Sequence, residues 1–164
     1  CFKQGAMPFY LHKRVLGELK TRFDYIFTTE NKYPGSPVVE ARVIEKKPFE
    51  LNNLEVIPIN GYHNGLQVFG YRFLNFAYLT DMKTIDSVEL EKLKNLDVWI
   101  VDCVRYEPHY SHSHLALTLE WIEELKPKMS ILTHMGHWLD YKELKNKLPS
   151  RVVPGYDGLS INST

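Results

Sequence analysis

The chain has 164 residues, 44% of them hydrophobic, which fits one globular domain spanning residues 1–164. Lys and Arg together number 20, as do Asp and Glu, so there is no net basic field to attract a nucleic-acid duplex. Two cysteines are too few for a disulfide scaffold, and no apolar run approaches the roughly 20 residues of a membrane span. We therefore expect a cytoplasmic protein that does not enter the membrane.

The first half of the chain is predicted to be mostly strands. Met7–Leu11 predicts a short strand and Lys13–Phe23 has apolar residues at helical spacing, so together they predict a βα unit. Asn31–Pro37 combines Asn, Gly and two Pro and predicts a loop. Strands that face a core on one side are expected at Val38–Ile44 and Leu54–Ile59. Leu66–Tyr71 and Phe73–Thr80 follow, with Gly65 and Gly70 at the breaks, and predict an antiparallel meander.

From Asp86 onward, predicted helices and strands alternate. The segments are a helix from Asp86 to about Leu93, the buried strand Val98–Cys103, a helix burying Leu115, Leu119 and Ile122 that ends at Lys126, the strand Ser130–Thr133, and the helix Tyr141–Leu148. Strands followed by alternating helices and strands predict layered α/β packing. We expect Trp99, Ile100, Leu119, Ile122 and Ile131 to be buried.

Histidine and aspartate side chains follow four of the predicted strands. They are His63, Asp81, His109 with His112, and His134. Imidazole nitrogens and a carboxylate that can bridge two ions are suitable ligands for zinc, manganese or iron. We therefore expect His63, Asp81, His112 and His134 to lie in one cleft. The alternative for any single histidine is a local cap or pair, and His112-Ser113-His114 also fits the solvated start of a helix.

Several segments together resemble one family over nearly the whole chain. The runs Phe76–Asp81, Pro108–His112, Leu132–His137, Leu139–Tyr141 and Tyr156–Gly158 are similar to those of metallo-β-lactamase-fold hydrolases. The branch indicated contains the cyclic-phosphate phosphodiesterase of the carbon–phosphorus lyase pathway. The resemblance implies an α/β fold that is part of an αββα sandwich. The family's His-x-His-x-Asp-His motif is absent, so we expect this chain to be a C-terminal portion lacking the N-terminal strands.

The resemblance also implies roles for individual residues. His63 corresponds to a ligand of the first metal, His134 to a ligand of the second, and Asp81 to the carboxylate that bridges two divalent ions, zinc or manganese. His112 corresponds to a catalytic histidine that contacts the phosphate or protonates the leaving oxygen, and His109 belongs to the same loop. A loop hydrogen bond is the alternative for His109. A helix cap and an Asp-Gly turn are the alternatives for Asp140 and Asp157.

The function implied for the intact protein is a phosphodiesterase acting on small cyclic or nucleotide-like phosphate esters. The same metal core would also suit an ester, thioester or lactam hydrolase, because fold does not fix substrate. A metal-free, inactive fragment or binding module is the remaining alternative, and we expect this chain by itself to be inactive. An uncovered apolar sheet face would favour self-association or binding to the missing N-terminal portion.

Overall fold

The computed structural model describes residues 6–28 and 39–161. Its contacts divide the chain into two compact units, Cys1–Phe49 and Glu50–Thr164. The loop predicted at Asn31–Pro37 lies outside the described residues, and the single-domain organisation stays a prediction.

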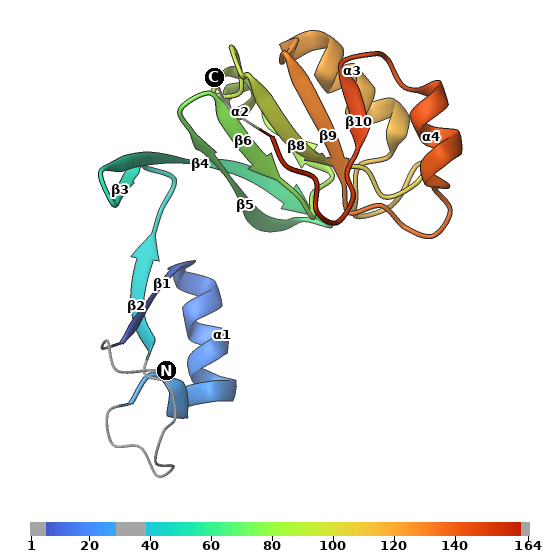
Figure 1. Ribbon diagram of the computed structural model, residues 1–164. Helices are drawn as coiled ribbons and strands as arrows, with labels where there is room; N and C mark the ends of the chain where they lie inside the picture. The colour runs from blue at the N-terminus through green and yellow to red at the C-terminus, as the bar shows by residue number, and fades with distance from the viewer. Residues whose placement is uncertain (1–5, 29–38, 162–164) are drawn as a thin grey trace. The chain divides into compact units, whose positions relative to one another are not determined.

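The first unit contains a short βαβ arrangement (Figure 1). Strand β1 (Met7–His12) leads into helix α1 (Lys13–Phe23) and the 3-10 helix η1 (Asp24–Ile26), and strand β2 (Val39–Ile44) pairs with β1 in parallel. The predicted βα unit is confirmed. His12 stands at the N-cap of α1, where its Nδ1 accepts a hydrogen bond from the Arg14 amide at 3.2 Å.

The second unit is built on an eight-stranded sheet with the order β10-β9-β8-β6-β5-β4-β3, and β7 pairs with β4. The strands are β3 (Phe49–Leu51), β4 (Leu54–His63), β5 (Leu66–Phe73), β6 (Phe76–Leu79), β7 (Thr84–Ile85), β8 (Val98–Asp102), β9 (Met129–Thr133) and β10 (Val152–Pro154). The helices are α2 (Ser87–Glu91), α3 (Leu115–Leu125) and α4 (Tyr141–Lys147). The predicted α/β class is confirmed.

The direction of the strands decides where polar chemistry can gather. Strands β6, β8 and β9 are parallel neighbours, and β5 is antiparallel to both β4 and β6. Strand β4 therefore runs in the same direction as the other three, and the carboxyl ends of all four meet at one edge of the sheet. Ligands in α/β folds commonly bind at such an edge.

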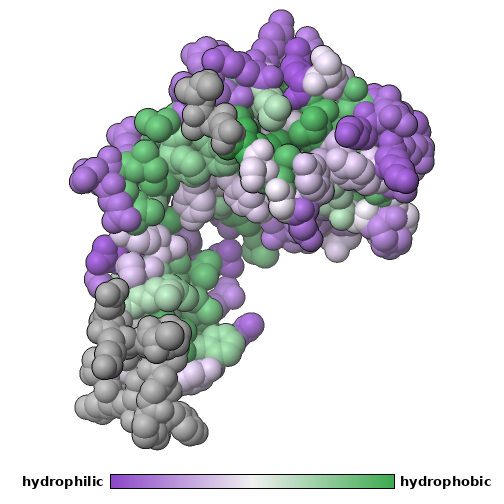
Figure 2. Space-filling view, viewed as in Figure 1, coloured by the Kyte–Doolittle hydropathy of each residue, from purple (hydrophilic) through white to green (hydrophobic). Residues whose placement is uncertain are grey.

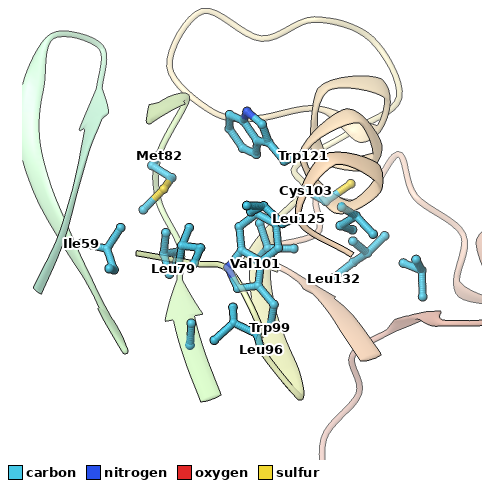
Figure 3. Packing of buried hydrophobic residues seen from close by; sticks show 14 of the residues in the cluster. Ile59, Leu79, Met82, Leu96, Trp99, Val101, Cys103, Trp121, Leu125 and Leu132 are labelled. Atoms are coloured by element: carbon cyan, nitrogen blue, oxygen red, sulfur yellow. The ribbon is translucent and has the colours of Figure 1, made fainter. Parts of the chain in front are cut away.

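The main core lies between one face of this sheet and the helices (Figure 3). Trp99 and Val101 on β8 are fully buried against Trp121 and Leu125 of α3. Alternate residues of a strand point to opposite faces, which explains why Ile100 is only partly buried.

The predicted burial is correct for Trp99, Ile122 and Ile131 and wrong for Ile100 and Leu119, which are partly exposed. The buried stripe of α3 instead runs through Thr118, Trp121, Ile122 and Leu125.

Two features of the strands differ from the sequence prediction. Gly70 does not end a strand but lies inside β5, buried, at a point where the Leu79 side chain occupies the space of a Cβ. The break falls instead at Leu74, which has a φ of 52°. Strands β3, β7 and β10 were missed because two or three residues are too short to show periodicity.

The second face of the sheet is partly covered by the chain that follows β10. This segment and residues Tyr78, Ile100 and Ile131 line a pocket of about 350 Å³. Figure 2 shows apolar surface over the middle strands, in contrast to the hydrophilic surface over α4. Within the described residues, no helix has the length and hydrophobicity that crossing a bilayer requires.

Candidate metal centre

Four strand ends supply the side chains of the candidate site. His63 is the last residue of β4, and Asp81 comes two residues after β6. His112 lies on the loop between β8 and α3, and His134 directly follows β9. The four residues that the sequence places near strand ends therefore lie at the same edge of the sheet.

Asp81 and His134 share a backbone conformation that few residues other than glycine adopt. Both have a φ of 59°, in the left-handed region. Such a conformation costs on the order of 1 kcal/mol and persists only where the surrounding structure enforces it. Asp81 and His134 follow the two strands on either side of β8, and both have potential ligand side chains, which favours a functional reason for the strain.

The four side chains converge around one carboxylate oxygen. Asp81 Oδ1 lies 3.4 Å from His63 Nε2, 3.5 Å from His112 Nδ1 and 3.9 Å from His134 Nε2. The Nε2 atoms of His63 and His112 are 3.3 Å apart. The structure thus brings together the four residues expected to share a cleft, while their individual roles stay predictions.

A fifth side chain, Asp102, was missed by the sequence analysis. It is the last residue of β8, is fully buried, and has Oδ2 3.5 Å from His112 Nδ1. Burial raises its pKa to about 6, against the lowering effect of a hydrogen bond from the Met82 amide. The only signal in the sequence is a carboxylate inside an otherwise apolar strand, and this pattern by itself predicts no more than a strand residue.

Asp102 also fixes the loops that carry the other site residues. Its Oδ2 accepts a hydrogen bond from the Met82 amide at 3.1 Å, next to Asp81. Its main-chain oxygen accepts from Ser113 Oγ at 2.6 Å and Thr118 Oγ1 at 2.8 Å, and the Ser113 amide donates to the Met82 carbonyl at 2.7 Å. One buried aspartate therefore ties the Asp81 loop to the His112 loop.

Burial also shapes the chemistry of His112. The side chain is 14% exposed, and burial lowers its pKa, with the neighbouring imidazoles of His134 and His63 acting in the same direction. The neutral imidazole is the form that binds a metal, whereas proton donation requires the charged form. A negatively charged phosphate beside His112 would favour that charged form.

The donor set fits divalent metal ions. Two groups of three side chains have potential ligand atoms within 4.8 Å of one another: His63, Asp81 and His112, and Asp102, His112 and His134. Among the described residues, the buried atoms Asp102 Oδ1 and His112 Nδ1 lack a hydrogen-bond partner. Buried polar atoms are normally satisfied, so a bound cation is a reasonable partner for the Asp102 oxygen.

Other histidines and aspartates in the segments that resemble the family lie in local contacts or in a turn. His109 Nδ1 is 3.3 Å from both the Ser111 and the His112 amide, so it orders the loop that carries His112. His137 stacks on Trp138 with 3.9 Å between ring centroids. Asp140 caps α4 through the Glu143 amide, and Asp157 lies in an exposed turn. A catalytic role for His109 stays a prediction.

Comparison with known proteins adds to this geometry. The family model for the β-lactamase superfamily domain matches residues 1–135. The chain belongs to this superfamily. Solved proteins similar to it have the metallo-β-lactamase fold, so the α/β metallo-β-lactamase fold expected from the sequence is confirmed.

Three proteins illustrate the similarity. The crystal structure of a diphosphatase from the PhnP family is 31% identical, with a TM-score of 0.88, and covers 99% of this chain and 61% of that chain. The metallo-β-lactamase fold protein YhfI from Bacillus subtilis is 14% identical, with a TM-score of 0.73, and covers 94% of this chain and 64% of that chain. An octanoyltransferase of Porphyromonas gingivalis (strain ATCC BAA-308 / W83) is 33% identical over 153 residues, 92% of this chain and 31% of that protein.

This superfamily chain is shorter than the proteins it matches. It spans about a third of the curated relative and less than two thirds of both solved structures. The octanoyl transfer named for the curated relative is not assigned to the matched portion by this alignment, because most of that protein lies outside it.

Proposed function

We propose that the intact protein is a metal-dependent phosphodiesterase that hydrolyses small cyclic or nucleotide-like phosphate esters. The observation that carries the proposal is the convergence of three imidazoles on Asp81 Oδ1, at 3.4, 3.5 and 3.9 Å. The 31% identity to a PhnP-family diphosphatase supports phosphorus as the centre attacked. The branch containing the phosphodiesterase of the carbon–phosphorus lyase pathway remains part of this proposal.

In this proposal the residues divide into ligands and a proton donor. His63 and His134 would each hold one of two divalent ions, zinc or manganese, and Asp81 would bridge them. Such ions provide a nucleophile at neutral pH by acidifying water, and they offset the charge on a phosphoryl group. His112 would bind the phosphate and donate a proton to the departing oxygen.

Asp102 and His109 would position His112. Asp102 Oδ2 lies 3.5 Å from His112 Nδ1, so a carboxylate there would stabilise the protonated ring. His109 Nδ1 fixes the His112 main chain through its amide. The other ring nitrogen, His112 Nε2, lies 3.3 Å from His63 Nε2 and would carry the proton for the departing oxygen.

A substrate panel tests the reaction class. We would assay the full-length protein, loaded with zinc or manganese, on 2′,3′-cyclic AMP, bis(p-nitrophenyl) phosphate, p-nitrophenyl acetate, an acyl thioester and a β-lactam. Diadenosine diphosphate belongs in the panel because the similar solved protein is a diphosphatase. Hydrolysis of phosphodiesters is expected. Turnover of carboxylic esters, thioesters or lactams without phosphodiesters would refute the proposal.

Metal content separates the enzyme from a non-catalytic module. Residues 1–164 contribute one histidine and one shared aspartate to each proposed metal, fewer than the three protein ligands usual at catalytic zinc. We expect full-length protein to retain close to two equivalents after dialysis and residues 1–164 alone to retain less and be inactive. A metal-free full-length protein would favour the binding-module alternative.

We also propose that the second face of the sheet is an interaction surface for another copy of the chain or for an N-terminal portion of the intact protein. Tyr78 is 41% exposed there and Met129 37%. Residues 1–164 should self-associate in sedimentation experiments, and a Tyr78→Lys change should weaken the association. A monomer at high concentration would contradict the proposal. The cytoplasmic location stays a prediction.

A further inference from the structure

Two exposed aromatic side chains lie on the loops that carry His112 and His134. Tyr110 is 71% exposed and precedes His112 by two residues, and Trp138 is 54% exposed and follows His134 by four. Large aromatic residues bury surface readily, so their exposure beside a candidate site calls for a partner. We refer to Tyr110 and Trp138 as the aromatic rim.

Ring contacts connect Tyr110 to the candidate site. The Tyr110 ring centroid is 4.5 Å from that of His109, and the His109 centroid is 5.0 Å from that of His112. The Tyr110 carbonyl accepts a hydrogen bond from Lys83 Nζ at 3.3 Å, which joins this loop to the one after Asp81. Tyr110 is thus separated from the proposed proton donor by a single ring.

Trp138 is held in place although half of it is exposed. It lies in a turn closed by the Leu139 amide and the Gly136 carbonyl at 3.1 Å. A Cβ at Gly136 would lie 3.0 Å from the indole and 3.0 Å from the Val104 carbonyl, so the ring packs closely against the backbone at this glycine. The His137 ring and the Arg105 guanidinium, 5.8 Å from the indole centroid, contact it as well. The indole is therefore a fixed platform.

Two cations accompany the aromatic side chains. Arg105 donates to the carbonyls of Glu107 and Pro108, and Lys83 donates to the carbonyl of Tyr110. Within the described part of the chain, neither cation forms an ion pair with a carboxylate. Positive charge that is not neutralised attracts phosphate groups, and an aromatic face next to it suits a planar base.

We propose that the aromatic rim stacks a nucleobase, so that the substrate is a nucleoside phosphate ester whose phosphate reaches the cluster of His63, Asp81, His112 and His134. This inference rests on the proposed phosphodiesterase function and names its substrate class. Stacking is sequence-tolerant, because every base presents a π face. The rim therefore accepts several bases, while the phosphate cluster is common to all of them.

The test compares two cyclic phosphodiesters that differ in the base. Full-length, metal-loaded protein is assayed on 2′,3′-cyclic AMP and on ethylene cyclic phosphate, which has no base. Tyr110→Ala and Trp138→Ala should each raise KM for 2′,3′-cyclic AMP about tenfold, the effect of losing one stacking partner, with kcat nearly unchanged. KM for ethylene cyclic phosphate should not change, and Trp138→Phe should recover most of the loss. Leu74→Ala is the control, because Leu74 is an exposed apolar residue in the turn before β6. This variant should leave KM for both substrates unchanged.

Equal changes in KM for both substrates, or no change for either, would overturn the proposal. Calorimetry of AMP and ribose 5-phosphate provides a readout that does not depend on turnover. AMP should bind the metal-loaded protein about tenfold more tightly than ribose 5-phosphate, and Trp138→Ala should remove the difference. If no phosphodiester is hydrolysed, the proposed function fails, and equal affinities for the two ligands would separately refute the aromatic rim.

Discussion

Substitution of Gly70 by alanine connects core packing to the metal centre. A Cβ at this position would lie 2.3 Å from Leu79 Cγ and 2.8 Å from the Tyr78 carbonyl oxygen. Non-bonded carbon atoms stay about 3.5 Å or more apart, so Leu79 would have to move by about 1 Å. Leu79 is fully buried in the main core, and the carbonyl belongs to the backbone of β6. The clash can therefore be relieved only by separating β5 from β6.

Overpacking of a core typically costs about 1–3 kcal/mol. Because both clashing groups are immobile, we expect Gly70→Ala to lower the free energy of unfolding by about 3 kcal/mol, the upper end of that range. For a unit of this size the melting temperature should fall by about 10 °C. Asp81 follows Leu79 by two residues, so the displacement should also reduce the metal retained after dialysis.

Urea unfolding followed by circular dichroism measures the first effect, and elemental analysis of the full-length protein measures the second. Gly17→Ala is the matched control, since Gly17 lies within α1 and a Cβ there would meet nothing within 4 Å. Alanine in a helix interior should stabilise by about 0.5–1 kcal/mol and leave the metal unchanged. A Gly70→Ala protein with wild-type stability and metal content would refute the reasoning.

Four further predictions concern single side chains. Asp81→Asn removes the charge that offsets the repulsion between two cations, so metal and activity should be lost together, whereas His112→Ala should keep the metal and lower kcat by about 10²–10⁴-fold. For His112→Ala the loss should shrink with a nitrophenolate leaving group, and equal losses with good and poor leaving groups would exclude proton donation. Asp102→Asn keeps the shape of the side chain but removes its charge. Because Asp102 orients neighbouring site residues, metal binding should weaken about 10–100-fold, as measured by equilibrium dialysis. Cys103 is fully buried, and burial raises its pKa to about 12, so the peptide containing it should stay unalkylated at pH 8 until urea is added, as measured by mass spectrometry.

The sequence by itself determined the α/β class, most of the strands and helices, and the positions of the candidate ligands. Helical spacing and alternation act over a few residues, so Lys13–Phe23 and the strand at Val98 could be recognised locally. His63, Asp81 and His134 were found because a polar side chain within a few residues of the end of an apolar run is visible in the sequence. The resemblance to a known family then gave these residues their expected roles.

Tertiary structure decided what depends on pairing between distant segments. The importance of Asp102 comes from its contacts with Met82 and His112, which lie 20 and 10 residues away in the sequence and become neighbours only when β6 pairs with β8. Gly70 looked like a turn residue because nothing local shows that Leu79 will fill the space beside it. The position of the Trp138 indole likewise depends on two loops lying side by side, because the Gly136 amide donates to the Val104 carbonyl and Arg105 contacts the ring. Local periodicity carries no information about such contacts, because they are set by the packing of the whole sheet.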